Sequence, residues 1–209
     1  MLNTLTLRAA MGEIAAVMAE NRQYLIELDQ RNGDGDLGIS MAEGFGAASA
    51  FVNVSEETDL GKLLVGASKV FNEAAPSSLG TIMSFYMMGM ARTLKGHETA
   101  DTALVGEAMT SGVAKIMERA NSKPGEKTVL DALDPAARAL CAHADQGALA
   151  AWKAAATAAA DGSDSTAAMQ AVHGRAAYYG DKAIGLIDGG SVAGKLIFQA
   201  LYSAVTKLA

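Results

Sequence analysis

Hydrophobic residues recur every three or four positions along most of the chain, which is the spacing of one face of an α-helix. The first such run consists of Leu7, Met11, Ile14, Met18, Leu25 and Leu28. Similar runs predict helices over 41–52, 60–71, 79–94, 99–117, 129–144, 148–160 and 166–179, and a last helix that opens at 188–191. The run 79–94 is apolar nearly all round, so it is expected to be the most buried helix.

The alternating pattern that marks β-strands is absent, so the fold class predicted is all-α. No linker divides the 209 residues. Residues 1–209 are therefore expected to form a single domain, an antiparallel bundle or barrel of about eight helices. Composition agrees with this picture, because alanine and methionine supply much of the apolar content and both favour helix.

Charge and composition exclude several classes of protein. The net charge is −6 without a basic stripe, which argues against nucleic acid as a partner. Arg8 and Glu13 interrupt the N-terminal region before a signal peptide could form, and the richest apolar stretch, 82–90, is too short to span a bilayer. The expectation is a cytoplasmic protein that does not bind a membrane.

The acidic loop that follows the first hydrophobic run is the strongest chemical signal. Asp29, Asp34 and Asp36 lie within eight residues, and Gly33 and Gly35 allow the backbone to turn sharply between them. Three like charges this close repel unless a cation lies between them, and their oxygen atoms suit Mg²⁺ or Ca²⁺. The alternative is a solvated loop with helix-capping aspartates.

An EF-hand calcium loop is a second alternative for the same stretch. Counted from Asn32 as position one, its ligand positions three, five, nine and twelve hold Asp34, Asp36, Ser40 and Glu43. Position six, where the sharp turn requires glycine, is Leu37. Since 38–45 also resembles the start of a helix, the spacing disfavours an EF-hand.

A glycine-rich stretch near the C-terminus, 189–196, almost matches a P-loop. Lys195 has the expected place, but Leu196 replaces the Ser or Thr that would bind Mg²⁺. No strand precedes the stretch, so a true P-loop is rejected. The glycines before a helix start still present free backbone N–H groups, which suit a phosphate or simply form a flexible turn. Upstream, Arg175 could bind a phosphate through two N–H groups.

Four stretches taken in order resemble one family. They are Leu28-Asp29 with Gly33 to Gly38, then Leu79-Gly80-Thr81, then Pro124 to Thr128 with Asp131-Ala132-Leu133, and finally Gly174-Arg175-Ala176 through Tyr178, Gly180, Ile184-Gly185 and Asp188. The family is the nucleotide-binding L subunit of dihydroxyacetone kinases, which also forms the C-terminal half of single-chain versions.

The resemblance implies a barrel of eight antiparallel helices with ADP or ATP bound at one end. Two Mg²⁺ ions would lie between the phosphates and Asp29, Asp34 and Asp36. The residues placed against the nucleotide by this resemblance are Leu37, Gly38, Ile39, Ser40, Ser77, Ser78, Thr81, Val129, Arg175, Asp188, Gly189 and Gly190. In this family a separate K subunit holds the hydroxyketone, and in some bacteria a phosphotransferase-system protein rephosphorylates the nucleotide.

Several positions depart from the family pattern. Leu37 stands where the family usually has histidine, and Ser40 stands where many members have asparagine. The family's Gly-Gly-Ala-Ser-Gly nucleotide loop is replaced by 73–78, and its Asp-Pro-Gly by 188–190. The three aspartates are intact, so the resemblance implies phosphoryl chemistry, on dihydroxyacetone or on another short hydroxyketone such as a tetrulose.

The resemblance leaves two roles open for the chain. The first is the phosphoryl-transferring subunit of such a kinase, acting with a K subunit. The alternative is a non-catalytic ADP-binding regulatory subunit that binds a protein partner. A homodimer is compatible with either role.

Overall fold

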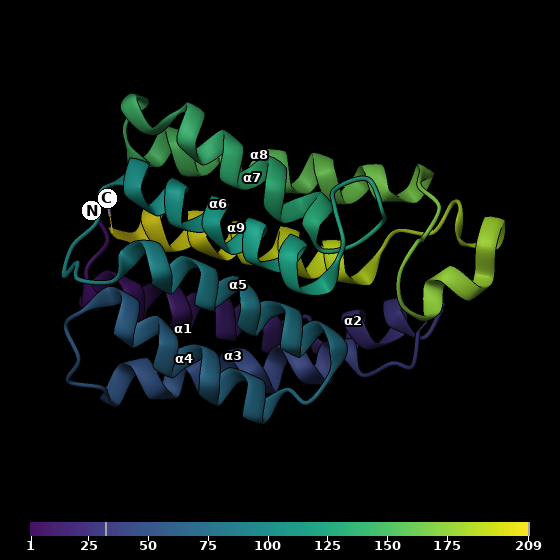
Figure 1. The fold of residues 1–209 in the computed structure, drawn as a ribbon, viewed down its shortest axis with the longest axis horizontal. Coiled ribbons are helices and arrows are strands. Elements are labelled where there is room, and N and C mark those ends of the chain that lie inside the picture. The colour runs from purple at the N-terminus through teal and green to yellow at the C-terminus, as the bar shows by residue number, and fades with distance from the viewer. Residues whose placement is uncertain (32, 209) are drawn as a thin grey trace.

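The structure is a computed structural model that describes residues 1–31 and 33–208. Its α-helices run back and forth along one long axis (Figure 1). They are α1 (Thr4–Glu20), α2 (Arg22–Asp29), α3 (Leu37–Val54), α4 (Leu60–Ala74), α5 (Ser78–Leu94), α6 (Thr102–Ala120), α7 (Leu130–Ala142), α8 (Ala148–Ser165) and α9 (Gly189–Leu208). Within the described residues, the β-pairing consists of one isolated bridge between Leu2 and Ala100.

The long helices form a closed ring. Each helix from α3 to α9 packs against the next one in the chain, and α1 packs against both α3 and α9. The short α2 continues the direction of α1 and packs mainly against α3. This arrangement confirms the expected all-α antiparallel barrel of about eight helices.

The alternation of helix direction places four chain connections at one end of the barrel. The helices α3, α5, α7 and α9 begin at this end, and both chain termini lie at the other (Figure 1). Every helix N-terminus carries a partial positive charge from its aligned peptide dipoles. The end where these four helices begin, here called the site end, therefore suits anions.

Three of the predicted helix boundaries are wrong. The first run breaks at Asn21, whose side-chain amide donates to the Val17 carbonyl oxygen at 2.8 Å, so α2 begins after it. Residues 161–163 do not end the helix before them: α8 continues to Ser165, because Gly162 lets it approach the Asp131 carbonyl closely.

The third correction concerns the predicted helix 166–179. The structure has two short 3-10 stretches instead, Thr166–Ala168 and Arg175–Ala183. Gly174 and Gly180 adopt φ of 64° and 53°, which interrupts any continuous helix. The periodic spacing in this region is therefore not that of a helix face.

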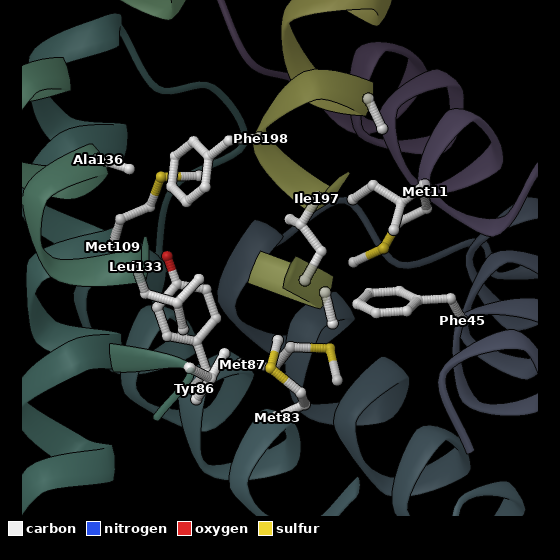
Figure 2. Packing of buried hydrophobic residues seen from close by; sticks show 14 of the residues in the cluster. Met11, Phe45, Met83, Tyr86, Met87, Met109, Leu133, Ala136, Ile197 and Phe198 are labelled. Atoms are coloured by element: carbon white, nitrogen blue, oxygen red, sulfur yellow. The ribbon is translucent and has the colours of Figure 1, made fainter. Parts of the chain in front are cut away.

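The barrel interior is filled by methionine, leucine and aromatic side chains. Figure 2 shows Ile197 of α9 among Met11, Phe45, Met83 and Met87, which come from α1, α3 and α5. Flexible methionine side chains fill irregular gaps between helices well. The ring is therefore closed around a packed core.

The expectation that 79–94 is the most buried helix is wrong. Met88 in α5 is 41% exposed, and α3 and α9 each bury more residues than α5 does. In a closed ring every helix keeps one face toward solvent, and in α5 that face carries Ser78, Thr81, Met88 and Arg92. Burial in this fold follows a helix's place in the ring.

One described helix, α3, is long and apolar enough to cross a membrane by length and composition alone. Half of this stretch is buried inside the barrel. It also packs against α1, α2 and α4, as a core helix does.

Candidate functional site

The three aspartates of the acidic loop form a cluster at the site end. Asp29 is the last residue of α2, and Asp36 immediately precedes α3. Each of Asp29, Asp34 and Asp36 offers a carboxylate oxygen, and these oxygens lie within 4.8 Å of one another. The three carboxylates thus lie as close together as the spacing suggests, and their role as metal ligands stays a prediction.

Two glycines allow the loop to fold over Asp29. The backbone N–H of Gly35 donates to Oδ2 of Asp29 at 2.8 Å, with φ of 78° at Gly35, a conformation that disfavours other residues. At Gly33 a Cβ atom would collide with the Asp29 carboxylate. The loop therefore wraps closely around this one side chain and fixes where it points.

The electrostatics of the cluster suit a hard divalent cation. Burial, and next the neighbouring charges of Asp34 and Asp29, raise the pKa of Asp36 above its usual range. Asp36 precedes α3 but makes no side-chain capping hydrogen bond, so its carboxylate is not used to cap the helix. Mg²⁺ prefers carboxylate oxygens of this kind, and it would relieve the repulsion. The residues present therefore fit the ion.

Arg175 approaches the cluster from the far end of the chain. Its Nη2 atom lies 2.8 Å from Oδ2 of Asp34. The charge of the guanidinium partly opposes the rise in the pKa of Asp36. The fold thus brings together the arginine and the aspartates that the sequence singled out separately.

The start of α9 lies next to the aspartate cluster and is here called the adjoining wall of the site. Oδ2 of Asp188 accepts a hydrogen bond from the Ser191 N–H at 2.6 Å, which caps the helix. Beneath it the hydroxyls of Ser191, Ser163 and Thr166 are buried and hydrogen-bonded to one another, with oxygen separations of 3.1 and 3.3 Å. Asp188 therefore rests on a rigid polar base.

Desolvation, with a smaller contribution from the nearby Asp131 and Asp29, raises the pKa of Asp188 to about 7. The hydrogen bond from Ser191 and the charge of Lys127 oppose this shift. Asp188 consequently carries less negative charge at neutral pH than an exposed aspartate does.

Four of the predicted nucleotide-binding residues meet pairwise at this wall. A Cβ atom at Gly189 would lie 3.1 Å from the Leu37 side chain, and one at Gly190 would lie 3.4 Å from the Val129 backbone nitrogen. The starts of α3, α7 and α9 therefore come close together. Because neither glycine carries a side chain, the three helix starts can approach one another this closely.

The remaining predicted residues divide between two helix starts. Gly38, Ile39 and Ser40 form the first turn of α3, where Gly38 and Ser40 are buried and Ile39 is 36% exposed. Ser77 caps α5 by accepting from the Gly80 N–H at 3.0 Å. Ser78 and Thr81 are exposed in the first turn of that helix, also at the site end.

The geometry agrees with the rejection of both the P-loop and the EF-hand. Lys195 lies 3.0 Å from Asp164 on the surface, and the described residues contain no strand that could support a P-loop. Glu43, the twelfth position of the EF-hand spacing, lies within α3 and outside the aspartate cluster. Asn32, the first position, lies outside the described residues.

Sequence patterns gave no individual role to Lys127 or Asp131, which the structure buries beside the site. Asp131 accepts hydrogen bonds from the N–H groups of Gly125 and Thr128. Lys127 donates to three backbone carbonyls. A signal was present in the chain, since two charged residues flank a predicted helix start after a Pro-Gly turn.

Comparison with known proteins supports the resemblance. A family model described as DAK2 domain matches residues 32–203. The chain is 30% identical to the PEP-dependent dihydroxyacetone kinase 1, ADP-binding subunit DhaL, of Listeria innocua, over 91% of each chain. It is 25% identical to the corresponding PEP-dependent subunit of Escherichia coli, over 88% of this chain and 89% of that one.

Longer proteins match as well. The chain is 28% identical to the L-erythrulose kinase of Pectobacterium atrosepticum and spans 92% of its own length but 33% of that enzyme. The crystal structure of the dihydroxyacetone kinase of C. freundii superimposes with a TM-score of 0.76 at 23% identity, over 97% of this chain and 35% of that one. This last likeness concerns the fold.

Proposed function

The chain belongs to the DAK2 domain family, and from this premise we propose that it is the nucleotide-binding, phosphoryl-transferring subunit of a kinase for dihydroxyacetone or another short hydroxyketone. The observation that carries the proposal is the Asp29, Asp34 and Asp36 cluster, with Arg175 beside it, at the end where four helices begin. Carboxylates, helix N-termini and an arginine together match a nucleotide phosphate chain with its metal ions.

The proposed cofactors are ADP or ATP and two Mg²⁺ ions. Asp29, Asp34 and Asp36 would hold the metal, while Arg175 and the backbone at 188–190 would bind phosphate. When bound, Mg²⁺ neutralises charge that develops on the phosphoryl oxygens during transfer. The half-neutral Asp188 adds little repulsion toward a phosphate at the adjoining helix start.

The first turns of α3, α5 and α7 supply the rest of the proposed nucleotide contacts. These would come from Leu37, Gly38, Ile39 and Ser40, from Ser77, Ser78 and Thr81, and from Val129. Leu37 packs against Gly189, so the family's usual histidine is replaced here by a residue that joins two helix starts.

The hydroxyketone would be bound by a separate K subunit. The three histidines of the chain give no acceptor site: His97 and His143 lie near the end opposite the aspartates, and His173 pairs with Glu126 at 2.6 Å. The relatives named PEP-dependent favour a phosphotransferase-system protein as the phosphoryl donor. We place the assembly in the cytoplasm.

Calorimetric titration with ADP, with and without Mg²⁺, tests the nucleotide and metal parts of the proposal. Binding should require Mg²⁺, and Asp34→Asn should weaken it, because a neutral amide replaces a charged metal ligand. Asp145→Asn, an exposed aspartate at the opposite end, is the matched control. Equal affinity for ADP in excess chelator would refute the proposal.

A second experiment distinguishes the regulatory alternative from the kinase role. A non-catalytic subunit would bind ADP with Mg²⁺ but would transfer no phosphoryl group when a K subunit and dihydroxyacetone are added. Product formation in that mixture, lost in Asp34→Asn and kept in Asp145→Asn, supports the kinase role.

A further inference from the structure

The segment 169–186 carries Arg175 to the aspartate cluster, yet it has almost no hydrophobic anchor. Its buried residues are the two small ones Ala171 and Ala183. Tyr178 is 91% exposed, and Val172 and Ile184 are about half exposed, at 55% and 49%. A segment with so few buried apolar contacts is expected to open easily unless polar contacts hold it.

Three of the polar contacts that hold this segment come from one side chain. The Lys127 ammonium donates to the carbonyl oxygens of Met169 at 3.2 Å, Ala183 at 2.7 Å and Leu186 at 2.6 Å. An ammonium group has three N–H donors, and all three are used. Because the three carbonyls come from both ends of the segment, this one residue fixes the span between them.

Lys127 is itself held in place at some conformational cost. It has φ of 61°, a left-handed conformation that is rare for residues other than glycine, and its side chain is 3% exposed. Burial lowers the pKa of Lys127, while the charge of Asp188 opposes that shift. The loop before it is fixed by Asp131, which accepts from the Gly125 and Thr128 N–H groups on either side.

The neighbouring Glu126 adds two further connections to the same segment. Its carbonyl accepts from the Val172 N–H at 3.3 Å, and its carboxylate lies 2.6 Å from Nε2 of His173. These contacts reach only the front half of the segment. The rear half, after Arg175, reaches the loop through the Lys127 ammonium.

We propose that Lys127 is a positioning residue: by joining the two ends of the segment 169–186 it holds Arg175 at the Asp34 carboxylate, where a nucleotide phosphate would bind. This inference rests on the proposed function. The Lys127 hydrogen bonds go to backbone carbonyls of 169–186 and not to Asp29, Asp34 or Asp36, so in this proposal it acts through Arg175. Without its charge, three carbonyls lose their donor and the segment loses its fixed span.

The test compares Lys127→Met with Lys123→Met, which changes an exposed lysine in the same loop. Lys127→Met should weaken Mg²⁺-dependent ADP binding by about tenfold or more. The rate of backbone amide hydrogen exchange should rise in 169–186 and stay unchanged in the barrel helices. Lys123→Met should behave like the unmodified protein in both measurements.

A double-mutant cycle with Arg175→Ala separates positioning from general destabilisation. If Lys127 acts through Arg175, adding Lys127→Met to Arg175→Ala should weaken ADP binding by less than about twofold further. Losses that multiply, or unchanged exchange in 169–186 in Lys127→Met, would overturn the inference.

Lys127→Arg is the second variant. It tests the positioning role if Lys127→Met loses its helical circular dichroism. The planar guanidinium of arginine cannot reproduce all three hydrogen bonds. ADP binding should therefore weaken, and hydrogen exchange in 169–186 should rise, by less than in Lys127→Met. Wild-type values in both measurements would then overturn the inference. If the unmodified chain binds no ADP, the proposed function fails, and the exchange comparison alone still decides whether Lys127 holds the segment.

Discussion

The Arg175 guanidinium lies 2.8 Å from the Asp34 carboxylate, so the proposed phosphate ligand occupies an oxygen that the proposed metal ion needs. In the proposed complex, metal and arginine would compete for this oxygen. Mg²⁺ at Asp34 would release Arg175 toward the phosphate, so the proposed metal and phosphate contacts would be linked through one carboxylate.

Arg175→Ala should therefore affect the two ligands differently. ADP binding in the presence of Mg²⁺ should weaken by about ten- to a hundredfold, the value of a contact to a charged group. Binding of Mg²⁺ alone should not weaken, because a competitor for Asp34 is gone. Calorimetry with each ligand measures both.

Lys195→Ala is the control for that prediction. Lys195 pairs with Asp164, so its loss should change ADP affinity by less than about threefold. Both variants must keep the wild-type helical circular dichroism. If Lys195→Ala abolishes binding while Arg175→Ala leaves it intact, the phosphate lies elsewhere and the P-loop hypothesis must be reopened.

Asp188 should make stability depend on pH. Its pKa is about 7 in the fold and near 3.8 in the unfolded chain, so between these values the native state binds more protons. The contribution of Asp188 to stability therefore falls as pH rises through this window, by up to about 1.4 kcal/mol per pH unit. Asp188→Asn should remove this dependence while an amide oxygen still caps α9.

Urea unfolding from pH 4.5 to 7.5 measures the effect. The free energy of unfolding of Asp188→Asn, minus that of the unmodified protein, should increase with pH. The exposed Asp145→Asn should give a constant difference. A constant difference for Asp188→Asn as well would show that this carboxyl is ionised throughout.

Tyr86→Phe should stabilise the protein. The Tyr86 hydroxyl is buried and has no hydrogen-bond partner among the described residues, its ring lies within the hydrophobic interior (Figure 2), and burial raises its pKa above the usual range. Removing an unsatisfied polar group should raise the free energy of unfolding by about 1 kcal/mol, or the Tm by about 2–4 °C. Tyr24→Phe, at a 48% exposed position, should leave the Tm unchanged.

The purified chain alone should not phosphorylate dihydroxyacetone. No histidine of the chain is available at the aspartate cluster, because His173 is engaged with Glu126 and the other two lie toward the opposite end. A coupled assay with Mg²⁺ and ATP should show turnover only after a K subunit is added. Robust turnover by the chain alone at physiological substrate levels would contradict the division of labour.

The sequence by itself determined most of the helix content and the clustering of the three aspartates. Helix periodicity is a local property, so the ring helices could be located from spacing alone. Asp29, Asp34 and Asp36 lie within one short loop, and Gly35 lets this loop turn back so that they come close together. The antiparallel alternation of helices then places the other predicted loops at the same end.

Only the tertiary structure decided which residues from distant parts of the chain contact one another at the site end. Asp34 and Arg175, Lys127 and Ala183, and Leu37 and Gly189 are far apart in the chain and meet because the ring closes. Such contacts depend on which helices become neighbours, which no local spacing encodes. The interruption of the predicted helix within 166–183 also involves a long-range contact. Backbone carbonyls that have no helical partner there accept hydrogen bonds from a lysine in another loop.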